Sequence, residues 1–438
     1  MKKVVKFGGS SLADAGQFRK VAAIVLKEES RRYVVPSAPG KRFQNDDKVT
    51  DLLIACHKAS QEGGAWQEIL GKIRSRYEAI RTELALAATL KHEFEEIEEH
   101  LRSGCSLDYM ASRGEYLNGI LLAEFLDYAF VDAAEVVFFD EQGRYDSAKT
   151  TRMMRECLAG KERAVIPGFY GSMPDGSIKT FSRGGSDITG AIVAQAINAD
   201  LYENWTDVSG FLVCDPRIVE NPRPIRTITY RELRELSYMG ATVLHAESIF
   251  PVKEAGIPIN IRNTNDPEAE GTMIVPHAGA LPSEEVITGI AGRKGFVVIR
   301  IEKDMMNQEV GFVLKVLEVL KEFNLNFEHL PSGIDTMCVV VNAQEIAGRE
   351  SMLLSALTKA VRPDFICMDR GLALVAVVGR GMKSAKGTAS RVFSAVASAD
   401  VNIRMIDQGS SELNIILGIR EEDFEDAIAN IYHAFYQE

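Results

Sequence analysis

The stretch KVVKFGGSS, from Lys3 to Ser11, gives the clearest indication of the fold in the first part of this 438-residue chain. Its first five residues form a short β-branched run that predicts a buried strand, and Gly8-Gly9-Ser10-Ser11 follows at once. Open α/β sheets bind ligands at the carboxyl ends of their strands. Unobstructed backbone amides, two hydroxyls and the Lys6 ammonium would meet there and suit a phosphate. A tight structural turn explains the same four residues equally well.

The first 290 residues alternate between short β-branched runs, such as the one in this stretch, and longer amphipathic segments. That order predicts a mostly parallel sheet covered by helices. Further strands are expected at residues 33–36, 134–138, 164–166, 201–205 and 257–261. Thr229 and Glu232 have the spacing of a capping box and predict a helix start.

The last third of the chain contains an internal repeat, because Gly371 lies 371 − 295 = 76 positions after Gly295 and other matches share this offset. The matched pairs are Gly295 and Gly371, Gly311 and Gly387, Val316 and Val392, Asn326 and Asn402, and Gly333 and Gly409. Each copy reads as strand, helix, strand, strand, helix, which predicts two packed ferredoxin-like modules. We therefore expect an α/β domain over residues 1–290 and modules over 295–370 and 371–438.

The overall composition excludes several classes of protein. With 46% hydrophobic and 26% charged residues, the chain can bury a sizeable core. A net charge of −12 disfavours nucleic acid and anionic membranes as partners, and no window approaches the ~18 apolar residues of a membrane span. Six widely spaced cysteines without a CxxC pair indicate core thiols in a reducing compartment. We expect a cytoplasmic protein.

Two further segments carry polar residues at the ends of predicted elements. Arg183-Gly184-Gly185-Ser186-Asp187 precedes an apolar helical pattern, so it places an arginine and free N–H groups at a helix N-terminus that favours anions. Thr206 and Asp207 leave a strand, and Asp215-Pro216-Arg217 follows. The first segment could hold only an acid favoured by the helix dipole, and the second could be an Asx turn.

No hydrolytic or metal centre is indicated by the remaining polar residues. The sequence shows no Ser/His/Asp or Cys/His arrangement, and its seven histidines lack HxxxH spacing, so we predict no metal held by the protein itself. A charged insert, KRFQNDDKV, follows Gly40, and the sequence assigns it no role.

These segments together resemble the aspartate kinases, members of the amino-acid kinase superfamily with C-terminal ACT regulatory modules. The resemblance covers nearly the whole chain and rests on motifs that follow one another in the family's order. They are KFGGSS at Lys6–Ser11, PSAPG with Ser37 followed by Thr50, RGE at Arg113–Glu115, PGF at Pro167–Phe169, RGGSD at Arg183–Asp187, TDVSG and DPR from Thr206 to Arg217, and GIPINIRNT with Arg262. The implied fold is an α/β amino-acid kinase domain with a mostly parallel sheet between helices, followed by two ferredoxin-like ACT domains.

The resemblance implies transfer of the ATP γ-phosphoryl group to the β-carboxylate of L-aspartate, with Mg²⁺ arriving on ATP. Because the substrate carboxylate attacks, such a site needs charge neutralisation and positioning rather than a nucleophilic side chain. The residues implied for catalysis are Lys6 and Asp187; for aspartate, Ser37, Thr50, Glu115, Arg183 and Ser186; for ATP, Lys6, Gly8, Gly9, Ser10, Thr206, Asp207, Arg217 and Arg262.

The ACT modules imply binding of an amino-acid effector that alters catalysis elsewhere. The residues implied for it are Met306, Asn307, Gly311, Phe312, Val313 and Glu328. Glu328 matches an acid of lysine-inhibited relatives, so lysine is the first expectation and threonine the second. Met306, Phe312 and Val313 could instead be core residues. Because ACT modules usually bury their sheet edges by pairing, a homodimer or higher oligomer is expected.

Two alternative functions remain open from the sequence. The first keeps the fold but phosphorylates glutamate or another amino acid; Glu115, Arg183 and the two ACT modules favour aspartate. The second is a catalytically inactive amino-acid sensor. Lys6 and Asp187 argue against it, because a sensor needs no charges that compensate phosphate.

Overall fold

The computed structural model describes residues 1–438 except 183, 242–243, 245, 277–284 and 437–438. The chain divides into two compact units. Unit 1 comprises residues 1–211, 224–233 and 242–280, and unit 2 comprises residues 212–223, 234–241 and 281–438. Among the described residues, no helix combines the length and the apolar character needed to cross a membrane.

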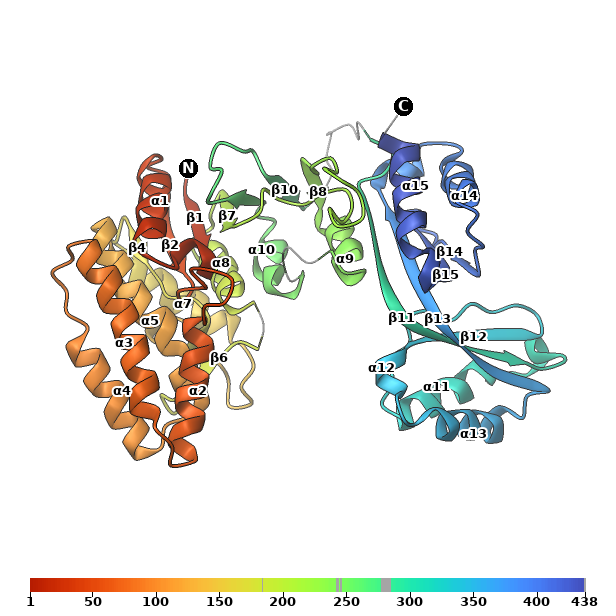
Figure 1. The fold of residues 1–438 in the computed structure, drawn as a ribbon, viewed down its shortest axis with the longest axis horizontal. Coiled ribbons are helices and arrows are strands. Elements are labelled where there is room, and N and C mark those ends of the chain that lie inside the picture. The colour runs from red at the N-terminus through yellow and green to blue at the C-terminus, as the bar shows by residue number, and fades with distance from the viewer. Residues whose placement is uncertain (183, 242–243, 245, 277–284, 437–438) are drawn as a thin grey trace. The chain divides into compact units, whose positions relative to one another are not determined.

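Unit 1 is built on an eight-stranded sheet with the order β3-β4-β2-β1-β7-β9-β10-β8 (Figure 1). The strands from β3 to β9 run parallel, and β10 is antiparallel to β9 and parallel to β8. The strands are β1 (Lys3–Phe7), β2 (Arg31–Pro36), β3 (Ala129–Phe130), β4 (Ala164–Val165), β7 (Leu201–Thr206), β8 (Thr227–Thr229), β9 (Ile259–Asn263) and β10 (Thr272–Val275), with a separate hairpin of β5 (Tyr170–Ser172) and β6 (Ile178–Thr180). The mostly parallel sheet predicted from the sequence is confirmed.

Helices flank this sheet (Figure 1), as the alternation of β-branched runs and amphipathic segments predicted. They are η1 (Gly9–Leu12), α1 (Ala15–Leu26), α2 (Val49–Gln61), α3 (Trp66–Glu83), α4 (Lys91–Ser103), α5 (Leu107–Leu126), α6 (Ala133–Val136), α7 (Ser147–Leu158), α8 (Gly185–Ala196), α9 (Tyr230–Tyr238), η2 (Ala246–Ile249) and α10 (Phe250–Ala255). The capping box is present at the start of α9, where Glu232 Oε2 accepts from the Thr229 N–H (2.9 Å) and hydroxyl (2.7 Å).

One strand prediction is wrong. Residues 134–138 were expected to be extended, but Ala133–Val136 forms the short helix α6. The Asp132 side chain accepts from the Ala134 N–H (2.9 Å) and caps this turn. A local cap therefore prevails over the β propensity of the valines that follow.

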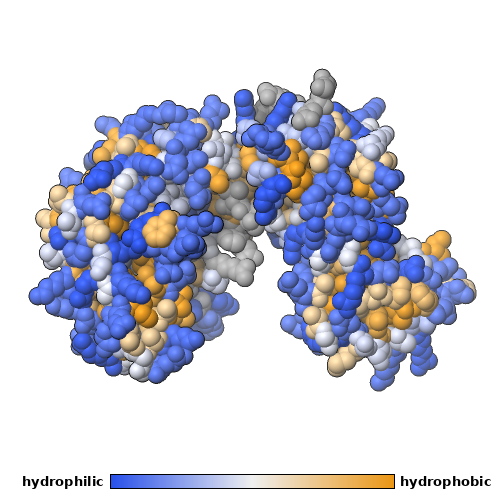
Figure 2. Space-filling model, in the orientation of Figure 1, coloured by the Kyte–Doolittle hydropathy of each residue, from blue (hydrophilic) through white to orange (hydrophobic). Residues whose placement is uncertain are grey.

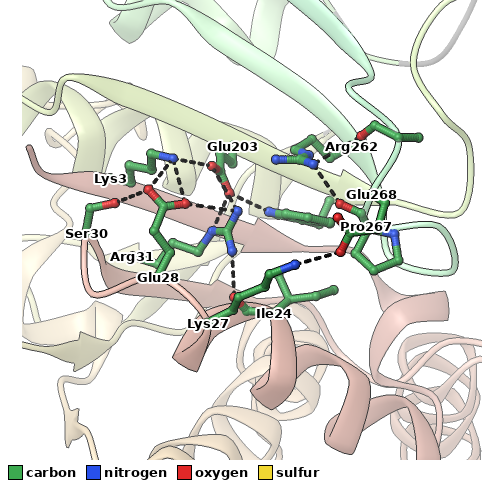
Figure 3. Close-up of polar contacts among 12 residues, drawn as sticks. Lys3, Ile24, Lys27, Glu28, Ser30, Arg31, Glu203, Arg262, Pro267 and Glu268 are labelled. Carbon is green, nitrogen blue, oxygen red and sulfur yellow. Dashed lines mark hydrogen bonds and ion pairs between the residues drawn. The ribbon is translucent and has the colours of Figure 1, made fainter.

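A buried ion network joins three parallel strands on one face of the sheet (Figure 3). Glu203 of β7 is 0% exposed and accepts from Lys3 Nζ (3.0 Å), Arg31 Nε (2.9 Å) and the Trp205 indole N–H (2.9 Å). Arg31 also donates to the Ile24 carbonyl of α1 (2.6 Å), so α1 packs on this face. Because each buried charge has a partner of opposite charge, the network can be buried without leaving an unpaired ion.

Unit 2 contains a five-stranded antiparallel sheet with the order β12-β11-β13-β15-β14 (Figure 1). Its strands are β11 (Gly289–Glu302), β12 (Thr336–Asn342), β13 (Phe365–Val378), β14 (Met405–Asp407) and β15 (Asn414–Arg420). Its helices are η3 (Met306–Gln308), α11 (Phe312–Glu322), α12 (Ala343–Ile346), α13 (Glu350–Val361), η4 (Arg380–Lys383), α14 (Thr388–Ser398), η5 (Glu421–Asp423) and α15 (Phe424–Tyr436).

The sequence repeat has equivalent structure in both copies except at one strand. The strand expected after the first helix of each copy forms as β14 in the second copy, whereas the first copy has only isolated bridges at His329 and Ser332 there. Gly311 and Gly387 are the N-caps of α11 and α14, with φ angles of 83° and 85°. Both copies share the long strands β11 and β13, and residues 289–293 of β11 pair with residues 374–378 of β13. The strand β13 of the second copy therefore gains a neighbour from residues of β11 that precede both repeats. The boundaries at residues 295 and 371 stay predictions.

Candidate active site

A lysine and a carboxylate meet on the opposite face of the unit 1 sheet from the buried ion network. Lys6 Nζ lies 2.7 Å from Asp187 Oδ1, and their side chains are 10% and 16% exposed. Lys6 pairs with Asn204 in the parallel register of β1 and β7, so both side chains project from the same face. Asn204 donates to Asp187 (2.9 Å) and accepts from Lys6 Nζ (3.4 Å). The ammonium is thus held at the carboxyl end of β1.

The glycine segment after β1 forms the short helix η1 rather than an extended loop. The Gly8 N–H donates to the Trp205 carbonyl (3.0 Å), which ties the segment to the end of β7. Ser10 is exposed, whereas Ser11 is buried and bonds the Thr264 hydroxyl (2.8 Å). Gly8, Gly9 and Ser10 therefore surround the strand end that carries Lys6.

Glu115 is a buried carboxyl beside this lysine. It is 5% exposed, and its Oε2 has no hydrogen-bond partner among the residues that the structure describes. Burial raises the pKa of Glu115 to about 8, against the lowering effects of the Ala38 N–H and the Lys6 charge. An unpartnered acid of this kind can accept a cationic ligand group.

Close packing brings Glu115 to the predicted substrate loop. A Cβ on Gly114 would lie 2.8 Å from the Ala38 Cβ, so only glycine lets α5 approach this loop. On α5, Asn118 donates to the Ser37 carbonyl (2.7 Å). Thr50 lies in the first turn of α2, which begins where this loop returns. Ser37, Thr50 and Glu115 thus come from adjoining elements.

The PGF and RGGSD motifs also lie together. The Gly168 N–H donates to the Pro36 carbonyl at the end of β2 (3.1 Å), and the Phe169 N–H donates to the Thr189 hydroxyl of α8 (3.0 Å). Ser186 is buried in the first turn of this helix, next to Asp187. Arg183, the predicted clamp for the substrate carboxylate, lies outside the described residues.

The residues predicted for ATP do not all gather at one place. Thr206 and Asp207 end β7, and their side chains are hydrogen-bonded to each other (3.1 Å). Arg217 belongs to unit 2, where it forms an ion pair with Asp215 (2.6 Å). Arg262 pairs in register with Trp205, so it projects from the face opposite Lys6.

The contacts of Arg262 confirm that location. Its guanidinium lies 4.8 Å from the Trp205 ring centroid and donates to the carbonyls of Pro267 (2.7 Å) and Ala269 (3.1 Å) (Figure 3). A role of Arg262 at a nucleotide phosphate therefore stays a prediction. Asn204, by contrast, was missed, although two adjacent polar residues, Glu203 and Asn204, between the aromatic residues of the strand YENW were an available signal.

The predicted effector residues lie around the start of α11 in unit 2. Met306 and Phe312 are buried in the core of the first repeat, as the core interpretation expected. Gly311 caps the helix and Val313 is 41% exposed. The first repeat thus presents only part of the predicted set to solvent.

Two further predicted effector residues already have protein partners. The Asn307 N–H donates to the Ile334 carbonyl (3.1 Å). The Glu328 carboxylate accepts a hydrogen bond from the Tyr238 hydroxyl, and burial together with this carboxylate raises the pKa of Tyr238 to about 12.

Comparisons with known proteins agree with this architecture. The amino acid kinase family model matches residues 1–263, and an ACT domain model matches residues 375–435. Aspartokinase 3 of Bacillus subtilis is 39% identical over 99% of this chain and 98% of that protein. The crystal structure of Clostridium acetobutylicum aspartate kinase is 50% identical, with a TM-score of 0.92 over 99% of this chain and 100% of that one.

A more distant relative has been solved with ligands. Escherichia coli aspartokinase III in complex with aspartate and ADP is 27% identical, with a TM-score of 0.76 over the whole of both chains. The same enzyme in complex with lysine and aspartate is 26% identical, with a TM-score of 0.75 over the whole of both chains. From its fold, its Lys6 centre and these relatives, the chain belongs to the amino acid kinase family, as an ATP-dependent aspartate kinase with C-terminal ACT domains.

Proposed function

We propose that this aspartate kinase transfers the γ-phosphoryl group of ATP to the β-carboxylate of L-aspartate, giving 4-phospho-L-aspartate for lysine, threonine and methionine synthesis. The observation that carries the proposal is the Lys6–Asp187 ion pair (2.7 Å) at a strand end that also gathers the glycine segment and buried Glu115. The aspartate and ADP in the Escherichia coli relative support the same substrates.

The chemistry requires stabilisation of charge on the transferring group more than covalent participation by the protein. We assign Lys6 to the γ-phosphate, with the amides of Gly8, Gly9 and Ser10 beside it. Each such donor contributes on the order of 3 kcal/mol to transition-state stabilisation. Asp187 and Asn204 hold the ammonium in place, so it need not reorganise during transfer.

The substrate is recognised at its two ends. We assign Glu115 to the ammonium of aspartate and Arg183 to its α-carboxylate. Ser37, Thr50 and Ser186 complete the hydrogen bonding around the reacting carboxylate. The attacking oxygen is held in line with the γ-phosphate. The two bound ligands therefore react within one complex instead of having to meet in solution.

We assign Thr206, Asp207, Arg217 and Arg262 to ATP on the resemblance alone, with Mg²⁺ arriving on the nucleotide. Magnesium keeps several waters and prefers phosphate oxygens, so it needs few protein ligands. The exposed carboxylate of Asp207 at the end of β7 is available to such an ion.

The buried Glu115 predicts how aspartate binding depends on pH. With its pKa raised to about 8, Glu115 is mostly neutral at pH 7 in the free enzyme, yet the substrate ammonium requires the carboxylate. Binding therefore releases a proton, and affinity rises with pH until Glu115 is ionised. The KM for aspartate is expected to fall roughly tenfold from pH 7 to pH 8.5. Steady-state kinetics at fixed saturating MgATP measures this.

Glu115→Gln provides the control for this pH dependence. The amide cannot ionise, so its KM for aspartate is expected to be high and flat between pH 7 and pH 8.5. A wild-type KM that does not change over this range, or a Gln variant that keeps the slope, contradicts the assignment of Glu115.

We propose that lysine, or alternatively threonine, inhibits the enzyme at the first ACT repeat, through Met306, Asn307, Gly311, Phe312, Val313 and Glu328. The lysine complex of the Escherichia coli relative supports an amino-acid effector of this kind. The side-chain ammonium of a bound lysine would compete with the Tyr238 hydroxyl for the Glu328 carboxylate. Effector binding would thereby replace a contact that unit 2 makes in the free enzyme.

We further propose that the ACT repeats mediate a homodimer or a higher oligomer. Figure 2 shows apolar surface over the part of unit 2 that carries α11 and α13. Exposed apolar side chains near α11 in the chain include Val310 (97%) just before this helix, Leu314 (59%) within it, and Ile334 (69%) before β12. Apolar surface of this kind often marks a protein interface.

The test of the proposed function is trapping of the acyl phosphate with hydroxylamine. Incubation with MgATP is expected to yield hydroxamate with L-aspartate but not with L-glutamate, and added lysine should lower the yield. Threonine in place of lysine tests the second effector. Absence of hydroxamate with every amino acid would favour the sensor alternative, whereas a glutamate product would favour the other kinase.

A further inference from the structure

Two arginines, one inside and one outside the charged insert after Gly40, bind the same carboxylate of that insert. Arg42 contacts the Asp46 carboxylate through Nε (2.8 Å), Nη2 (2.9 Å) and its own N–H (3.0 Å). Arg76 of α3 reaches the same carboxylate from outside the insert, with Nη1 at 3.3 Å. Asp46 is therefore the point at which the insert, residues 41–49, attaches to α3.

Arg76 also binds the backbone at the ends of two separate loops. It is 6% exposed, and its Nη1 donates to the Asp47 carbonyl (2.6 Å). Its Nη2 donates to the Gly40 carbonyl and to the Ala13 carbonyl (3.5 Å). Ala13 follows η1, the helix formed by the glycine segment, and Gly40 ends the substrate loop. One guanidinium thus connects both loops through its fork of donors.

These loops contact each other without intervening side chains. The Gly40 N–H donates to the Gly9 carbonyl (2.7 Å). A Cβ on Gly40 would lie 2.5 Å from the Gly9 carbonyl carbon, and one on Gly9 would lie 2.8 Å from the Ala38 oxygen. Because real Cβ atoms do not approach this closely, a displacement of one loop has to displace the other.

We infer that Arg76 is a positioning residue for phosphoryl transfer, because it aligns the glycine segment with the substrate loop. The insert acts with it as a strap that holds Gly40 in contact with Gly9. The inference rests on the proposed function, because it takes these loops to hold the γ-phosphate and aspartate. Arg76 touches neither ligand in this scheme. It acts through the backbone of Ala13 and Gly40.

A positioning role predicts a specific kinetic pattern. In Arg76→Met each loop can still bind its own ligand, but the reacting atoms are no longer aligned. A misplacement of about 1 Å costs on the order of 100-fold in rate. We expect kcat per folded molecule to fall by about 100-fold, with the KM values for ATP and aspartate within about threefold of wild type.

Two further variants separate positioning from folding. Arg76→Lys keeps the positive charge but not the forked arrangement of guanidinium donors. Its kcat should therefore lie between those of Arg76→Met and the wild type. Gly40→Ala forces the loops apart and leaves Arg76 intact, and it should reproduce the loss of kcat even if Arg76→Met does not fold. The matched control is Arg74→Met, on the same helix, whose partly exposed ion pair with Glu98 (2.7 Å) does not involve the insert.

The experiment is hydroxamate kinetics on each full-length variant, with the folded fraction measured by circular dichroism. Wild-type kcat per folded molecule in Arg76→Met or Gly40→Ala overturns the inference and leaves the proposed function standing. An equal loss in Arg74→Met also overturns it. Absence of hydroxamate with the wild-type enzyme is instead a failure of the proposed function.

Discussion

Replacing Lys6 by methionine is expected to lower kcat for aspartate phosphorylation by about 10²–10³-fold. The ammonium is placed by Asp187 (2.7 Å) and by Asn204 (3.4 Å), so it is fixed before ATP arrives. Methionine has a similar length but leaves the negative charge on the transferring phosphoryl group without its cation. Because Glu115 and the substrate loop remain, the KM for aspartate should change much less than kcat.

The measurement is hydroxamate formation at saturating MgATP and aspartate. Lys2→Met is the matched control, because Lys2 is exposed and lies just outside β1. Its kcat is expected to equal that of the wild type. Activity of Lys6→Met within tenfold of the wild type would remove Lys6 from the catalytic centre.

The second large effect concerns stability. Glu203→Gln is expected to lower the free energy of unfolding of unit 1 by about 3–5 kcal/mol. Glu203 is 0% exposed and compensates Lys3 (3.0 Å) and Arg31 (2.9 Å). The amide is nearly isosteric but carries no charge, so both cations lose their central partner. The remaining carboxylate partner of Lys3 and Arg31 is Glu28 at the edge of the network, and Arg31 also keeps its hydrogen bond to the Ile24 carbonyl.

Urea unfolding followed by tryptophan fluorescence suits this variant, since Trp205 donates to Glu203 (2.9 Å) and reports on the network directly. The matched control is Glu268→Gln. Its ion pair with Lys27 (2.6 Å) is formed by side chains that are 65% and 77% exposed, and such pairs contribute about 1 kcal/mol or less. If Glu203→Gln and Glu268→Gln lowered the free energy of unfolding equally, burial would not explain the destabilisation at Glu203.

Local patterns in the sequence were sufficient for the architecture of both units. Three local predictions are confirmed. The strand before Gly8 is β1, the capping box at Thr229 starts α9, and the repeat in the last third gives the equivalent helices α11 and α14. Each depends on residues that are close in sequence. The exception, residues 134–138, shows that one capping aspartate can reverse a short β-branched pattern.

The candidate site could be predicted only in part. Lys6, Asp187 and Glu115 were expected to act together, and the structure places Lys6 against Asp187 and beside Glu115. Asn204 was not foreseen, because it lies 198 positions from Lys6 and reaches it only through the register of β1 and β7. The location of Arg262 opposite Lys6 depends in the same way on the register of β7 and β9.

Periodicity and motif order are local properties of the chain, so they were enough to predict the parallel sheet, the repeated modules and the residue types that suit phosphate. Which charged side chains meet could be seen only in the folded protein. Glu203 compensates Lys3 and Arg31 across three strands, and Arg76 joins Ala13 to Gly40 from a different helix. Such contacts depend on strand register and helix packing, in which residues far apart in the chain become neighbours.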